Sequence, residues 1–148
     1  MTASDRSART ARADELCAQA FAAAGCPGSG VALVAVGGYG REELAPYSDL
    51  DVVLVHDPHV EPGDWAGAIW YPLWDSGATI DHSVRSLTEA AEQASADLRV
   101  ALGLLDARHL AGDPNLTLRL RSALLTQWRR DARKRLPELH RLVTGRAP

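Results

Sequence analysis

Several features that mark particular protein classes are scarce in this sequence. The longest apolar run, Val31–Val36, has six residues, far fewer than the roughly 20 that a membrane-spanning helix needs. The two cysteines, Cys17 and Cys26, lack metal-binding or redox spacing and fit reduced thiols better than a disulfide framework. Residues 1–12 contain no apolar region of the kind found in secretory signals. We therefore expect a cytoplasmic protein without a membrane segment.

An excess of positive charge is also missing. Sixteen Lys and Arg against 19 Asp and Glu give a formal net charge of −3, which argues against nucleic acid as a partner. The one basic run, Arg129–Arg135, is interpreted as a solvated helix face. Hydrophobic residues make up 46% of the 148 and charged residues 24%. This composition is typical of a single globular domain with a sizeable core.

Local patterns predict helices and strands in alternation. An Ala-rich helix over 5–24 begins after Ser4 as its N-cap and ends before Gly25. Val31–Val36 is apolar on both faces, which is typical of a buried central strand. The other predicted elements are a short helical turn over Arg41–Leu44, a strand over 50–55, a helix over 64–76 that Pro72 kinks or breaks, a strand over 78–85, a helix opened by the capping box Ser86–Glu89, a helix over 96–110 and a long helix from Asp113–Pro114.

This order predicts an α/β (α+β) fold with a small mixed central sheet, here of three strands, flanked by helices. The single domain, 1–148, divides into a helical N-terminus (1–30), a core that carries the candidate site (31–95) and a helical C-terminal part (96–148). Trp65, Trp70 and Trp74 follow helical spacing, so we interpret them as core or interface packing.

A glycine-rich turn follows the first predicted strand. Gly37, Gly38 and Gly40 leave room for a phosphate chain to approach the backbone, and their N–H groups can point at it. Eleven residues after Gly38, a second strand opens with Asp49 and Asp51. Because strand side chains alternate, these two carboxylates are expected to share a face.

Paired carboxylates on a rigid strand suit a hard cation, Mg²⁺ or Mn²⁺, which binds through a few carboxylates and substrate phosphates. Each half of the pattern alone is common and often structural. Together, a phosphate-binding turn facing an acidic metal pair is the arrangement for nucleotidyl transfer.

Three stretches carry a family resemblance: GGYGREELAPYSDLDVVLV, WYPLWDSGATIDHSVRS and DLRVALGLLDARHLAGD. The first resembles the glycine-turn and acidic-strand pattern of the nucleotidyltransferase superfamily. All three, within about 34–113, resemble the N-terminal domain of bacterial protein-PII uridylyltransferases. The resemblance implies transfer of UMP from UTP to a tyrosine hydroxyl of the PII nitrogen-regulatory protein.

The resemblance also implies roles for individual residues. Gly37 and Gly38 would bind phosphate, Asp49 and Asp51 would hold the metal, and Arg41 and Ser48 would lie around the nucleotide. The superfamily has a third carboxylate on a later strand that activates the acceptor hydroxyl. Asp81 is our candidate, with an incidental polar residue as the alternative. Its neighbour His82 is either structural or part of the site, and Arg85 pairs either with phosphate or with an acidic side chain.

Other functions stay open at this point. The chain is alternatively a catalytically inactive nucleotide-binding or protein-interaction module, or a transferase for another nucleotide or acceptor. Full-length family members carry an uridylyl-removing domain and glutamine-sensing domains, whose motifs are not found here. We expect an excised domain, a truncated product or a free-standing relative, without uridylyl removal or glutamine control.

Overall fold

A mixed four-stranded sheet forms the centre of the protein, whose computed structural model describes residues 2–144. The strands are β1 (Val31–Ala35), β2 (Leu50–His56), β3 (Ile80–Ser86) and β4 (Arg108–Gly112). They lie in the order β3-β2-β1-β4, and β2 and β3 run parallel while β1 is antiparallel to both of its neighbours. This architecture confirms the predicted fold class of a small mixed sheet flanked by helices.

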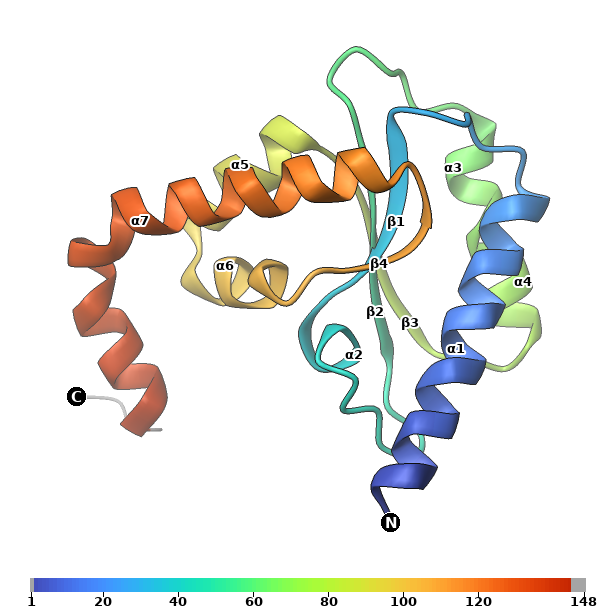
Figure 1. The fold of residues 1–148 in the computed structure, drawn as a ribbon, viewed down its shortest axis with the longest axis horizontal. Helices are drawn as coiled ribbons and strands as arrows, with labels where there is room; N and C mark the ends of the chain where they lie inside the picture. Colours follow the sequence, from blue (N-terminus) through green and yellow to red (C-terminus); the bar gives the residue numbers. More distant parts are fainter. Residues whose placement is uncertain (1, 145–148) are drawn as a thin grey trace.

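Helices cover both faces of this sheet (Figure 1). One face packs against α1 (Ala3–Ala23), α3 (Asp64–Ala68) and α4 (Trp70–Asp75), and the other against α5 (Leu87–Ala96), α6 (Leu98–Leu105) and α7 (Pro114–Thr144). Every residue of β1 is buried. Leu33 packs into the first layer and Val34 into the second, so the run of apolar residues serves two cores and confirms the predicted central strand.

The fourth strand corrects the prediction of a helix over 96–110 and of a three-stranded sheet. The helix α6 ends at Leu105, where tight turns place the amides of Asp106 and Ala107 on the carbonyls of Gly103 and Leu104. Residues Arg108–Gly112 then pair with β1. The Leu-rich periodicity continues across this boundary, and only pairing with a strand 73–80 residues away in sequence shows that the chain has become extended.

Helix boundaries differ from the prediction at two further places, and a predicted break is found at a third. Thr2, not Ser4, caps α1 in a capping box with Asp5, with N···O distances of 3.1 and 3.2 Å. The glycine turn itself forms the short helix α2 (Gly37–Gly40), whereas the predicted helical turn over Arg41–Leu44 does not form. The helix predicted over 64–76 is broken as expected, because Pro72 has no N–H to donate to the carbonyl of Ala68.

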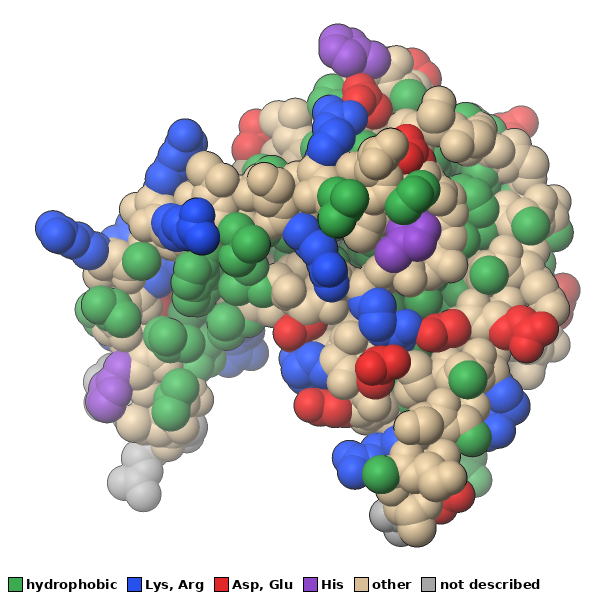
Figure 2. Space-filling view, viewed as in Figure 1, with side chains coloured by type: hydrophobic (Ala, Val, Ile, Leu, Met, Phe, Trp, Pro, Cys, Tyr) green, Lys and Arg blue, Asp and Glu red, His purple; other side chains and the backbone are tan. Residues whose placement is uncertain are grey.

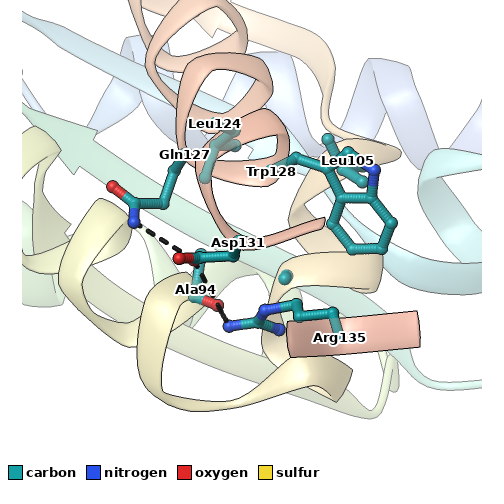
Figure 3. A pocket seen from close by; sticks show the side chains of 8 residues that line it. Ala94, Leu105, Leu124, Gln127, Trp128, Asp131 and Arg135 are labelled. Carbon is teal, nitrogen blue, oxygen red and sulfur yellow. Dashed lines mark hydrogen bonds and ion pairs between the residues drawn. The ribbon is translucent and has the colours of Figure 1, made fainter. Parts of the chain in front are cut away.

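The basic run Arg129–Arg135 is only partly a solvated face, which corrects that interpretation. Asp131 and Arg135 are buried, at 7% and 3% exposure. Figure 3 shows Arg135 reaching from α7 to the end of α5, where it donates to the carbonyls of Ala94 and Ser95. Asp131 accepts a hydrogen bond from Gln127 at 3.1 Å. The cavity beside them holds about 10 Å³, room for one water molecule.

The C-terminal half of α7 bends away from the body, and Pro137 lies in this part of the helix (Figure 1). Figure 2 shows a hollow between this half and the body, with hydrophobic side chains along α7. Exposed apolar residues of α7 are Leu118, Leu125, Leu136, Leu142 and Val143. None of the helices within residues 2–144 is both long and apolar enough to cross a bilayer.

Candidate active site

A cleft of about 410 Å³ opens between the sheet and α6, on the face that α5, α6 and α7 cover. Its walls come from the end of β1, the start of β2, the length of β3 and one side of α6. The lining residues are Val36, Gly37, Asp51, Val52, Val53, Asp81, His82, Ser83, Arg85, Arg99, Val100, Gly103 and Leu104. Two carboxylates, two guanidinium groups and the glycine turn therefore share one cavity.

Strand pairing brings the candidate carboxylates together. Asp51 on β2 is the direct neighbour of Asp81 on β3 in the parallel register, and Val53, two residues on, packs into the core on the same face. Leu50 and Val52 are buried on the opposite face, as predicted from strand alternation. Asp49 immediately precedes β2 and is exposed.

The electrostatics of Asp51 show how close these groups are. Burial raises the pKa of Asp51, and the negative charges of Asp81 and Asp49 raise it further, while the positive charge of Arg41 opposes them. Three carboxylates that repel one another are tolerated when a cation is held among them. Burial, followed by the charges of Asp81 and Asp49, therefore disfavours the ionised form of Asp51.

The glycine turn lies directly against Asp51. Gly37 has a φ of +57°, and a Cβ at this position would come within 3.1 Å of the Asp51 Oδ2 atom. A side chain would therefore fill the space beside the carboxylate. Within residues 2–144, the amides of Gly37 and Gly38 donate no hydrogen bond, and Val36 provides no side-chain cap. These N–H groups can receive an anion.

Polar side chains from α1 and β4 hold the glycine turn in place. The buried Tyr39 hydroxyl donates to Asp14 Oδ1 at 2.7 Å, and Arg108 forms a bidentate ion pair with Asp14 at 2.6 and 3.2 Å. Arg108 also donates to the carbonyls of Tyr39 and Gly40 and lies 5.3 Å from the centre of the Tyr39 ring. Burial raises the pKa of the Tyr39 hydroxyl, followed by the neighbouring Cys17 and Asp14. The tyrosine therefore stays neutral and donates to the carboxylate.

Gly40 has a packing function in this structure. A Cβ there would collide with the carbonyl of Asp106 and lie 3.0 Å from that of Ala35. Arg41 pairs with Asp106 at 2.7 Å and with Glu43 at 3.3 Å. Its Nη2 atom lies 3.8 Å from the position of a Gly38 Cβ, so the guanidinium borders the turn.

Ser48 lines another cavity, and the His82 ring packs away from the cleft although the residue borders it. The Ser48 hydroxyl accepts a hydrogen bond from the Ala45 amide at 3.0 Å, and the residue lines a different cavity beside α1. The His82 ring packs against the rings of Trp70 and Trp74, with centroid distances of 4.6 and 5.5 Å. It thereby points to the face opposite Asp81, which favours the structural interpretation of this histidine. Trp70 is buried and Trp65 packs against the same core, as predicted, whereas Trp74 is 45% exposed.

Three functional candidates were missed in the sequence. Asp14 and Arg108 come from α1 and β4, and their pairing depends on a contact between segments 94 residues apart. Arg99 reaches the cleft from α6, and, like Arg108, it lies within the third stretch that carries the family resemblance. The resemblance marked that stretch without giving these residues a role, and their contacts follow only from the tertiary arrangement.

The donor set fits a divalent cation held jointly with a ligand. Within the described chain, no three His, Cys, Asp or Glu side chains form a group that could hold a metal by themselves. Two carboxylates completed by phosphate oxygens are the usual ligands of Mg²⁺ in such sites.

Comparison with known proteins identifies the family of the chain. The nucleotidyltransferase domain family model matches residues 25–105, more than half of the chain. The chain is 55% identical over 129 residues to the bifunctional uridylyltransferase/uridylyl-removing enzyme of Streptomyces coelicolor, covering 86% of this chain and 15% of that protein. It is 49% identical over 122 residues to the protein of the same name from Mycobacterium tuberculosis, covering 80% and 15%. The chain thus spans about 15% of the length of these relatives, and it belongs to the nucleotidyltransferase domain family.

Proposed function

We propose that this chain transfers UMP from UTP to a tyrosine hydroxyl of the PII nitrogen-regulatory protein and releases pyrophosphate. The supporting observation is the position of Asp51, which neighbours Asp81 in register and lies against Gly37. One carboxylate thereby faces both a second acid and a backbone anion site. The uridylyltransferase names of the relatives support the choice of UTP, and the resemblance of the sequence motifs supports PII as the acceptor.

In this proposal, the acidic residues bind the metal ion and the glycine turn binds the phosphates. Asp49 and Asp51 would hold Mg²⁺ or Mn²⁺, which when bound neutralises charge on the phosphates and the leaving pyrophosphate. The free amides of Gly37 and Gly38 would bind the phosphate chain. Arg41, at the border of the turn, contributes positive charge to the same end.

Asp81 would act as the general base. It is exposed on β3, the edge strand, where an acceptor from another protein can reach it. The tyrosine oxygen of the acceptor forms a bond to the α-phosphorus of UTP as the bond to pyrophosphate breaks. The hydroxyl proton passes to the Asp81 carboxylate, a typical general-base step.

The test is transfer of label from α-labelled UTP to purified PII in the presence of Mn²⁺. We expect transfer by the wild type and at least a 100-fold loss in Asp49→Asn/Asp51→Asn. Asp75→Asn is the matched control, because Asp75 is an exposed acid of α4 outside the cleft, and it should retain full activity. Metal-dependent UTP binding without any transfer would instead support a binding module, and transfer from ATP but not UTP would refute the choice of base.

A further inference from the structure

The cleft carries positive charge at the end farthest from its carboxylates. Arg85 on β3 and Arg99 in the first turn of α6 both line it. Strand alternation places Asp81, Ser83 and Arg85 on one face. Four residues of strand separate the acid from Arg85, roughly 13 Å at the usual rise. The cleft is therefore polarised, with acids at one end and guanidinium groups at the other.

Arg85 has an unusual environment among the arginines. Within residues 2–144, four arginines are buried or half-buried: Arg9, Arg85, Arg108 and Arg135. The other three have hydrogen-bond partners, whereas the Arg85 side chain makes neither a hydrogen bond nor an ion pair with any residue that the structure describes. Its charge acts on Glu89, but that carboxylate already accepts a hydrogen bond from the Ser86 amide at 2.9 Å. A partly desolvated cation without a partner is costly unless a ligand completes it.

Arg99 faces the same cavity from the opposite wall. The Asp97 carboxylate caps the Arg99 amide at 2.9 Å, while its guanidinium has no partner among the described residues. A Cβ at Gly103, one turn further along α6, would meet nothing within 4 Å. The wall beside Arg99 is therefore open enough for a ligand to lie between α6 and β3.

We propose that Arg85 and Arg99 bind the phosphate chain of the nucleoside triphosphate from the end of the cleft opposite the metal-binding acids. This inference rests on the proposed function. Guanidinium groups match phosphate oxygens with paired hydrogen bonds. With both in place, the phosphate chain lies between the amides of the glycine turn and two cations, and its position relative to Asp81 is fixed from both sides.

The experiment measures equilibrium binding of UTP, UMP and inorganic tripolyphosphate to the full chain with Mg²⁺ present. We expect Arg85→Gln and Arg99→Gln each to weaken UTP and tripolyphosphate binding about tenfold, and UMP binding by about twofold or less. Arg85→Lys retains the charge but not the paired geometry and should recover part of the loss. Arg130→Gln, an exposed arginine of α7, changes the net charge equally and should bind all three ligands as the wild type does.

The outcomes separate this inference from the proposed function. Neither Gln variant should melt below the wild type, because neither side chain has a partner to lose among the described residues; Arg85→Gln should melt at or above it, because the half-buried charge is removed. Unchanged tripolyphosphate binding together with a raised KM for the acceptor would overturn the inference and assign the cations to an acidic segment of the acceptor. If the wild type transfers label and both Arg85→Gln and Arg99→Gln bind UTP as well as the wild type does, the inference alone fails. If the wild type binds neither UTP nor tripolyphosphate, both fail.

Discussion

Replacing Gly37 by alanine should damage both the fold and the site, and the structure gives the size of the effect. The residue has a φ of +57°, a conformation that costs an L-residue with a Cβ about 1–2 kcal/mol. The added Cβ would also lie 3.1 Å from Asp51 Oδ2, so the carboxylate must shift. For a domain of this size each kcal/mol lowers the melting temperature by about 2–4 °C. We expect a total loss of about 3–6 °C.

The assay compares Gly37→Ala with Gly67→Ala by thermal melting and by UTP binding with Mn²⁺. Gly67 lies in α3, and a Cβ there would meet nothing within 4 Å, so alanine should stabilise the protein by about 0.5–1 kcal/mol. Gly37→Ala should in addition weaken nucleotide binding at least tenfold, whereas Gly67→Ala should leave it unchanged. If both variants melt and bind alike, the close contact between the glycine turn and Asp51 is refuted.

Three further perturbations test other parts of the structure. Because the pKa of Asp51 is raised in the folded protein, ionisation of this carboxyl destabilises the fold as the pH rises above its pKa in the unfolded chain, near 4. Asp51→Asn should therefore melt roughly 1–2 °C above the wild type at pH 7, and the difference should shrink below pH 4. Mn²⁺ should not raise the melting temperature of this variant. Arg108→Met removes the Asp14 ion pair and two carbonyl contacts and should cost about 1.5–3 kcal/mol, with a raised KM for UTP in steady-state assays. Arg135→Ala leaves Asp131 buried and the end of α5 uncapped; denaturant titration should show a loss of about 2–3 kcal/mol, with unchanged UTP binding by the folded protein.

Elements that depend on interactions between residues close in sequence were predicted correctly. The doubly apolar run Val31–Val36 predicted a central strand, and the capping box of Ser86 and Glu89 predicted the start of α5, whose reciprocal hydrogen bonds measure 2.9 and 3.0 Å. The alternation of Asp51 with buried Val52 placed the carboxylate on the correct side of the strand. In each case the deciding interactions lie within a few residues.

Long-range pairing limited the prediction elsewhere. The strand β4 forms because Arg108–Gly112 pairs with β1, and nothing in its own five residues overrides the preceding helical periodicity. The ion pair between Asp14 and Arg108 and the burial of Asp131 and Arg135 likewise depend on which helix faces which neighbour. The roles of individual residues in nucleotide and metal binding, including those of Asp81 and Ser48, stay predictions.

Uptake of Mn²⁺ in the presence and absence of UTP, followed by calorimetric titration of the wild type and of Asp49→Asn/Asp51→Asn, tests the central claim most directly. The account predicts that the wild type binds Mn²⁺ weakly alone and at least tenfold more tightly with UTP, because phosphate oxygens must complete the two carboxylate ligands. The double variant should show no such coupling. Equal Mn²⁺ uptake by both proteins, or uptake by the wild type that UTP does not change, would contradict the assignment of this cleft to metal-dependent nucleotidyl transfer.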